Sequence, residues 1–158
     1  VKSIMQSIFD GDVYGLDRFY CDDIYSRYDS FHFDIERQVK GFLAPVVGNH
    51  YTTAKAQQVY RNLKAGQHLV ELRFDPTNKF DTNAIMVYSF IDNHMLGYVE
   101  KAAAKKLATQ LNYLFDDYDL NYLSKSKIKL SAIVQTAASH MGRLVVEVVN
   151  YEFLIKEK

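Results

Sequence analysis

Residues 72–108 read LRFDPTNKFDTNAIMVYSFIDNHMLGYVEKAAAKKLA, and this stretch decides the fold. Apolar residues alternate on both sides of a polar segment, which is typical of two antiparallel strands. The dipeptide Asp92-Asn93 tolerates the positive φ of a two-residue hairpin turn, so a third strand should follow. An alanine- and lysine-rich run then predicts a helix. The stretch therefore predicts an antiparallel sheet with one strong helix after its central hairpin.

The polar segment at residues 75–84, DPTNKFDTNA, contains one aromatic residue, Phe80. Its Asp and Asn side chains can hydrogen-bond their own backbone, which predicts a rigid surface loop, and such loops often bind a ligand. Phe80 could instead fold inward and plug the sheet, and the pattern leaves both readings open. Asp75, directly before Pro76, is interpreted as a structural turn residue rather than a ligand.

The rest of the chain from residue 43 also follows a strand pattern. A first strand is predicted at Val46-Val47-Gly48-Asn49-His50-Tyr51, after Pro45. Five or six short strands around one helix imply an α+β fold in which a small antiparallel OB-like β-barrel closes on itself. The other predicted elements are a short helix at 54–63, strands at 68–74, 84–91 and 94–99, the main helix at 101–115, and strands at 127–136 and 143–154.

Composition changes near Phe42. Residues 1–42 carry five Lys/Arg and eight Asp/Glu, a balance of −3, and the other residues carry fourteen and eleven, a balance of +3. Apolar spacing in residues 1–40 predicts helices. We therefore expect a helical, acidic and aromatic extension at 1–42 and a barrel domain at 43–158. The extension could cover an open end of the barrel, or it could form a separate partner-binding surface.

The overall composition limits the class of protein. A length of 158 residues suits one compact domain, and a net charge of zero argues against coating nucleic acid by bulk electrostatics. Cys21 is the only cysteine, which excludes an internal disulfide. No apolar run approaches the roughly 20 residues of a membrane span, and no signal peptide is expected. A cytoplasmic location and no membrane partner are the resulting expectations.

Catalytic and cofactor patterns are missing from the sequence. There is no glycine-rich phosphate loop, no recognisable Ser or Cys nucleophile, and no His/Cys/Asp/Glu cluster with metal-ligand spacing. Asp75 and Asp81 lie in one loop without a third carboxylate, so a nuclease-like metal pair is not favoured. The sequence predicts no enzyme activity, no cofactor and no metal.

Three of these features, in this order, resemble a known family. They are a strand ending in Val46-Val47-Gly48, the Asp-Pro-x-Asn-x-aromatic-Asp-x-Asn-Ala loop at 75–84, and a hairpin closing on Gly97-Tyr98-Val99 before an alanine-rich helix. The chain looks like a HIRAN domain over about residues 43–153. The resemblance implies an OB-type barrel of the kind found in remodelling helicases of replication-fork repair and in smaller bacterial and phage proteins. It also implies binding of single-stranded DNA, including a free 3′ end.

The resemblance assigns roles to particular positions. Phe80 matches a loop aromatic that stacks on a base, and Asp81 matches a carboxylate that meets the terminal hydroxyl. The sequence departs from the family at Lys79, where a Pro is usual, at Asn49, where a basic residue is common, and in a long excursion at 52–65. The nucleic-acid-binding residues expected from the resemblance are His50, Tyr51, Asn78, Lys79, Phe80, Asp81, Tyr98 and Lys101.

The residue chemistry agrees with these roles. A base stacked on an aromatic ring contributes about 1–3 kcal/mol, whatever the base. A carboxylate repels DNA unless it accepts a hydrogen bond from a sugar hydroxyl, which an unblocked 3′ end supplies. Tyr98 could belong to the core or to the site, and Lys125, Lys127 and Lys129 could form a solvated strand face or follow a DNA backbone. Two functions remain open: a DNA-repair or DNA-processing module that acts with a helicase or nuclease, and a protein-interaction domain with the same barrel and no DNA site.

Overall fold

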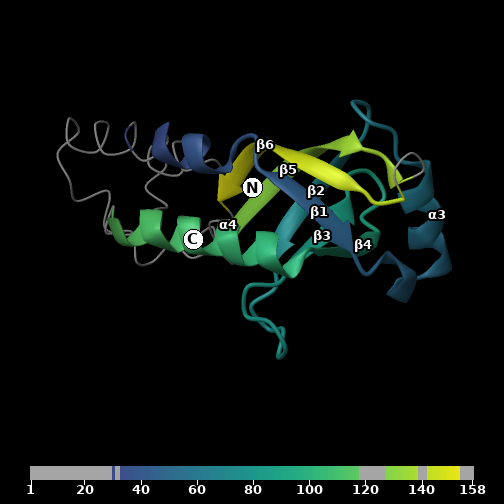
Figure 1. Cartoon of the computed structure of the whole chain (residues 1–158), viewed down its shortest axis with the longest axis horizontal. Helices are drawn as coiled ribbons and strands as arrows, with labels where there is room; N and C mark the ends of the chain where they lie inside the picture. The colour runs from purple at the N-terminus through teal and green to yellow at the C-terminus, as the bar shows by residue number, and fades with distance from the viewer. Residues whose placement is uncertain (1–29, 31–32, 118–126, 139–141, 154–158) are drawn as a thin grey trace, which may run out of the picture.

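The structure is a computed structural model that describes residues 30, 33–117, 127–138 and 142–153. Its centre is a closed barrel of six strands in the spatial order β1-β4-β3-β2-β5-β6, with every neighbouring pair antiparallel (Figure 1). The predicted antiparallel barrel is thus confirmed, with six strands. The strands are β1 (Leu43–Val47), β2 (Leu69–Phe74), β3 (Ile85–Ser89), β4 (Met95–Val99), β5 (Ile128–Thr136) and β6 (Val145–Phe153).

Besides a short helix at residues 33–39, two helices and one helical turn of the described residues surround the barrel. The turn η2 (Asn49–Tyr51) follows β1, α3 (Ala54–Asn62) lies at one end of the barrel, and α4 (Lys101–Asp117) follows β4 (Figure 1). Helix α3 begins where Thr53 accepts a hydrogen bond of 3.1 Å from the main-chain nitrogen of Ala56, which satisfies one free donor of the first turn. Among the described helices, none is long and apolar enough to cross a bilayer.

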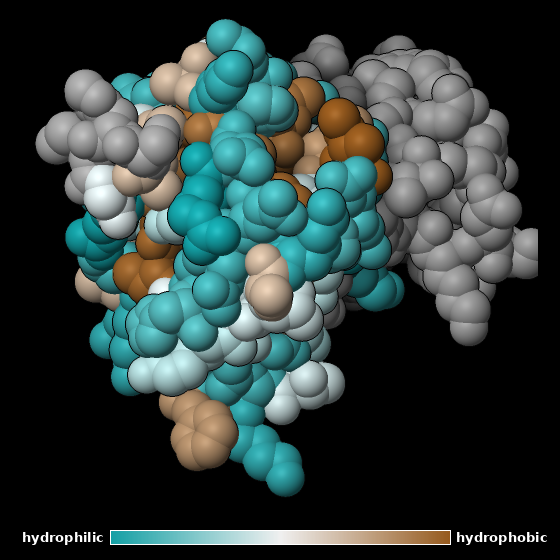
Figure 2. Space-filling view, turned by 90° about the vertical axis from the view of Figure 1, so that its right-hand side faces the viewer, coloured by the Kyte–Doolittle hydropathy of each residue, from teal (hydrophilic) through white to brown (hydrophobic). Residues whose placement is uncertain are grey.

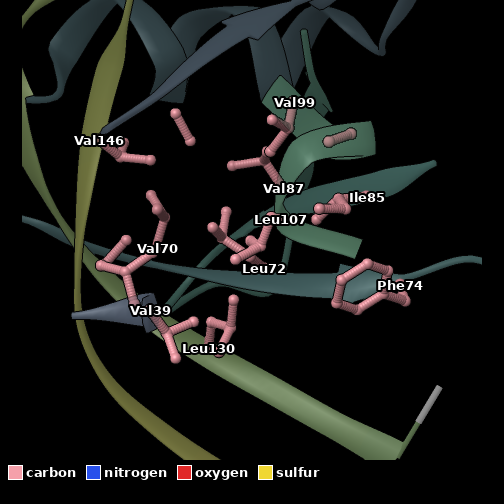
Figure 3. Packing of buried hydrophobic residues seen from close by; sticks show 14 of the residues in the cluster. Val39, Val70, Leu72, Phe74, Ile85, Val87, Val99, Leu107, Leu130 and Val146 are labelled. Carbon is pink, nitrogen blue, oxygen red and sulfur yellow. The ribbon is translucent and has the colours of Figure 1, made fainter. Parts of the chain in front are cut away.

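The surface on the α3 side is mostly hydrophilic, with a few apolar residues among the polar ones (Figure 2). The interior is apolar, because alternate residues of each strand point inward. Val70, Leu72 and Phe74 of β2 are buried, as their alternation predicts, and pack with residues of the other strands and of α4 (Figure 3). Burying one such side chain contributes about 1.5–3 kcal/mol. The core of the barrel is therefore continuous with the packing of α4.

Helix α4 matches its predicted pattern. Its apolar stripe faces the barrel because these residues recur at helical spacing. The helix extends two residues past the predicted end at Phe115, to Asp117. All members of the predicted stripe are buried: Ala104, Leu107, Ala108, Leu111, Leu114 and Phe115.

Residues 33–39 form a short helix at the opposite end of the barrel from α3 (Figure 1). Its Ile35 and Val39 are fully buried in the same hydrophobic cluster as the strands. The expected helical extension lies otherwise at residues 1–29 and 31–32, outside the described residues. The domain boundary near residue 42 stays a prediction, but the barrel core includes two side chains from before it.

The bounds of three predicted strands were wrong: those of the first strand and those of the two hairpin strands. The first strand ends at Val47, because Gly48 has φ 81° and turns the chain into η2, so His50 and Tyr51 are not strand residues. The hairpin strands stop at Ser89 and resume at Met95, which leaves Phe90 and Ile91 in the turn rather than in a strand. In both places local backbone geometry outweighed the apolar pattern.

Candidate nucleic-acid interface

The loop between β2 and β3, residues 75–84, projects away from the barrel (Figure 1). Its ends remain paired, since the main-chain nitrogen of Asp75 donates to the carbonyl of Ala84 at 2.9 Å. Within the loop, Asp75 accepts a hydrogen bond of 2.7 Å from the hydroxyl of Thr77. Local bonds of this kind hold a loop in one conformation without help from the core. The interpretation of Asp75 as a turn residue agrees with this geometry.

Asn78 organises the tip of the loop. Its Oδ1 accepts hydrogen bonds from the main-chain nitrogens of both Phe80 and Asp81, each at 2.9 Å. Two donors converging on one side-chain oxygen fix the direction of the chain at Phe80. The structure thus gives Asn78 a supporting position within the loop.

The ring of Phe80 lies outside the barrel, with 96% of the residue exposed. The alternative in which it plugs the sheet is therefore wrong. An apolar ring left in water has no packing role, and a conformation that keeps it there offers a flat face to a partner. Lys79, beside it, is also exposed and could meet an anionic group.

Asp81 has one carboxylate oxygen engaged and one available. Its Oδ1 accepts a hydrogen bond of 2.9 Å from the main-chain nitrogen of Asn83. Within the described part of the chain, Oδ2 accepts no hydrogen bond, and the residue is only half buried. The side chain therefore holds the loop through one oxygen and can accept a donor from a ligand through the other.

His50 and Tyr51 lie together in η2. Both side chains are exposed, Tyr51 by 85%, and their ring centroids are 4.0 Å apart at an interplanar angle of 43°. Asn49 anchors the turn to β4, because its Nδ2 donates to the carbonyl of Leu96 at 2.8 Å. Alternation along a strand would have sent the two rings to opposite faces, whereas the helical turn presents both to solvent.

Tyr98 lies on β4, between the strand that leads into η2 and the strand that follows the loop at 75–84. Across one edge of β4 it pairs with Val47, the last residue of β1 before the chain turns toward His50. Across the other edge it pairs with Met86, at the start of β3 after the loop. Tyr98 is half buried on the outer face, so it combines a packing role with a partly open surface.

Lys101 is exposed at the first position of α4, directly after β4. The structure brings together His50 with Tyr51, and Asn78 with Phe80 and Asp81. It does not pack Phe80 or Lys79 against the η2 pair, since both loop side chains project into solvent. The expected residues therefore form two exposed groups, with Tyr98 between them.

Sequence reasoning did not foresee a charged cluster on the outer face of β2. Glu71 is 8% exposed and forms ion pairs with Arg73 and Lys129, the latter at 3.2 Å. Burial raises the pKa of Glu71, but the hydrogen bonds and charges of Arg73 and Lys129 outweigh it and hold the pKa below its ordinary value. Lys129 is thus a partner of Glu71 rather than a solvated strand residue, and Lys125 lies outside the described residues.

Arg73 also lies over the ring of Tyr88, with its guanidinium carbon 4.3 Å from the ring centroid. Asn93 accepts a further hydrogen bond of 2.9 Å from Arg73. The only signal for this cluster in the sequence was the alternation of Glu71 and Arg73 on one face of a strand. Among the described residues, no three His, Cys, Asp or Glu side chains are grouped so that they could hold a metal ion.

Several solved structures are similar to this chain. No curated protein matches it. A crystal structure of a Lactobacillus plantarum protein is similar, with a TM-score of 0.50 and 22% identity over 72% of this chain and 95% of that one. A crystal structure of the HIRAN domain of human HLTF has a TM-score of 0.45 and 21% identity over 72% and 77% of the two chains. An NMR structure of the HLTF HIRAN domain in its DNA-bound conformation has a TM-score of 0.43 and 21% identity over 72% and 76%.

The family model described as "HIRAN domain" matches residues 39–148. This range contains β1, the loop at 75–84, the β3–β4 hairpin and α4, and it ends within β6. It also covers well over half of the 158 residues. The chain therefore belongs to the HIRAN domain family.

Proposed function

We propose that this HIRAN domain binds single-stranded DNA and recognises an unblocked 3′ end, in DNA repair or processing beside a helicase or nuclease. One observation carries the proposal: Phe80 is almost fully exposed on a loop whose tip Asn78 fixes. A hydrophobic ring held in water by dedicated hydrogen bonds suits stacking on a base, since every base has a π-face. Family membership supports the same reading, because a HIRAN domain of human HLTF has been described in a DNA-bound conformation.

Asp81 gives the proposal its end specificity. Its free Oδ2 can accept a hydrogen bond from a terminal 3′-hydroxyl, whereas a 3′-phosphate would bring a second negative charge against the carboxylate. The engaged Oδ1 keeps the side chain in place for this contact. The proposal assigns binding to this chain, and catalysis to a partner.

The electrostatics predict a weak, salt-dependent complex. The net charge is zero, and Lys79 and Lys101 are the exposed lysines among the expected binding residues. If these two lysines neutralise two phosphates, the slope of log affinity against log salt is about −1 to −2 for a single strand. We therefore expect micromolar or weaker dissociation constants at physiological salt.

Fluorescence anisotropy with labelled oligonucleotides tests the stacking role. Phe80→Ala should lower affinity roughly tenfold, because one stacked base is worth about 1–3 kcal/mol. Phe80→Tyr should bind nearly as well as wild type, since it keeps the ring. Tyr113→Ala, which removes an exposed ring from α4, is the matched control and should change nothing. Equal binding by Phe80→Ala and wild type would overturn the stacking assignment.

The end-recognition role needs a different pair of probes. Wild type should bind a 3′-hydroxyl oligonucleotide more tightly than the same oligonucleotide with a 3′-phosphate. Asp81→Asn keeps an oxygen for the Asn83 nitrogen but removes the charge, so it should lose most of that preference while the loop stays intact. An unchanged preference in Asp81→Asn would contradict the role of Asp81, whatever the result at Phe80.

A further inference from the structure

The β3–β4 turn exposes two adjacent apolar residues that the proposed DNA site does not use. Phe90 is 50% exposed and Ile91 is 85% exposed. Turns of this kind are ordinarily polar, and Asp92 and Asn93 supply the usual turn chemistry here. Beside them, half of Phe90 and most of Ile91 remain exposed to solvent, and adjacent exposed apolar residues of this sort mark interaction surfaces.

The same turn forms one wall of a groove of about 410 Å³. Val59 of helix α3 and Leu63, directly after the helix, line the opposite wall, and Leu69 of β2 also lines the groove. Figure 2 shows this side of the molecule, where apolar residues reach the surface among polar ones. A volume within the range of about 300–1,000 Å³ is sufficient for a ligand or for the side chains of a protruding turn.

The charges of the two walls are opposite. Lys55 lines the groove from α3, and Asp92 lines it from the turn. Both are exposed, and neither forms an ion pair with any other residue that the structure describes. One positive and one negative charge give the groove no surplus of positive charge, so a phosphate backbone is not favoured there. An occupant with an apolar tip and one acidic residue fits the α3 wall.

The β3–β4 turn itself has that chemistry. We propose that two copies of this chain associate through a two-fold clasp, in which the Phe90–Ile91 turn of each copy lies in the groove of the other. In such an isologous contact the same patch serves both copies, so every interaction occurs twice. Ile91 of one copy packs against Val59 and Leu63 of the second, and Asp92 of one copy pairs with Lys55 of the second.

The clasp leaves the proposed DNA site open. The groove residues of α3 lie on a different face of the helix from Gln57, whose Nε2 donates to the carbonyl of Thr52 at 3.0 Å beside η2. The loop at 75–84 leaves the barrel from the far ends of β2 and β3, away from the β3–β4 turn. Self-association is therefore independent of DNA binding, and failure of either proposal leaves the other standing.

Sedimentation velocity over a wide range of protein concentration tests the apolar part of the clasp. The wild-type chain should pass from monomer to dimer, and Ile91→Glu should remain monomeric at the concentrations where wild type dimerises. Tyr113→Glu is the matched control, since it replaces an exposed apolar residue of α4 and should dimerise as wild type does. The proposal would be overturned if wild type were monomeric at all concentrations or if Ile91→Glu formed dimers. In the first case the groove would be assigned to a different protein.

Charge reversal tests the pairing. Lys55→Asp and Asp92→Lys should each weaken dimerisation roughly tenfold, because a repulsive pair then occurs twice. Mixing the two variants should restore it, since both contacts in the mixed dimer join opposite charges. The double variant should also dimerise. The affinity for the labelled single-stranded oligonucleotide, measured by anisotropy, should be the same for wild type, Lys55→Asp, Asp92→Lys and the double variant. If the mixture stays as weak as the separate variants, the clasp geometry is wrong.

Discussion

The Oδ1 atom of Asn78 lies 2.9 Å from the main-chain nitrogen of Phe80 and accepts its hydrogen bond, while the ring of Phe80 points away from the barrel. The same oxygen also accepts from the nitrogen of Asp81. A polar side chain thus holds an apolar ring in water, where the ring adds no packing to the fold. The relationship links loop stability to binding, and it can be broken at one position.

Asn78→Ala should lower both stability and DNA affinity. Loss of two hydrogen bonds to Oδ1 should reduce the free energy of unfolding by about 1–2 kcal/mol. Affinity for a single-stranded oligonucleotide should fall several-fold, because the ring must then be ordered on binding. Urea denaturation and anisotropy measure the two effects. Thr82→Ala, an exposed change in the same loop, is the control, and equal behaviour of the two variants would contradict the supporting position of Asn78.

Gly97→Ala should destabilise the barrel. Gly97 has φ 149°, and a Cβ there would collide with the carbonyl oxygen of Val47. Backbone strain of this kind costs about 1–3 kcal/mol, and the collision between β1 and β4 adds to it. Gly66→Ala provides the comparison, since Gly66 has φ 74° but open space around its Cα. Thermal unfolding should show a clearly larger loss for Gly97→Ala; losses of equal size would mean that β1 can move aside.

Glu71→Gln should lower stability at neutral pH but not in acid. The folded-state pKa of Glu71 lies below its ordinary value, so its ion pairs stabilise the fold fully above the unfolded pKa of about 4.3. That contribution is lost as the pH falls through the lowered folded pKa. The free energy of unfolding of wild type should therefore exceed that of Glu71→Gln by about 1–2 kcal/mol at pH 7, and this difference should close below about pH 4.

Denaturant unfolding at a series of pH values measures this gap. Glu147→Gln on β6 serves as the control, because Glu147 forms no ion pair with the described residues. Its difference from wild type should stay near zero at neutral pH. A Glu71→Gln gap that does not change with pH would mean that the charge of Glu71 is not what stabilises the fold.

Truncation that removes the helix at 33–39 should destabilise the barrel. Ile35 and Val39 are fully buried in the barrel core, so a chain that begins at residue 41 loses both. Loss of a buried aliphatic side chain costs about 2–5 kcal/mol. A chain that begins at residue 30 keeps both side chains and is the comparison. Comparison of their denaturation midpoints checks this, and equal midpoints would show that the helix at 33–39 adds nothing to the barrel.

Much of the fold follows from the sequence, because local patterns specify it. The alternation of Val70, Leu72 and Phe74 determined which face of β2 is buried, and the helical spacing from Ala104 to Phe115 determined the inner stripe of α4. The Asp and Asn residues of the loop at 75–84 indicated its self-bonded conformation for the same reason. Each of these features depends on neighbours within a few positions, so the sequence contains the information directly.

Only the tertiary structure decided the remaining features, because they depend on residues that are distant in sequence. The exposure of Phe80 could be seen only in the folded chain, because other side chains fill the closed barrel and the loop that carries Phe80 projects away from it. Glu71 became a buried ion because barrel closure brings Lys129 of β5 beside it. The same closure places the Phe90–Ile91 turn opposite α3 and so creates the groove. The sequence thus determined the helices and strands. Tertiary packing determined which side chains are exposed to solvent, which form ion pairs and which line the groove.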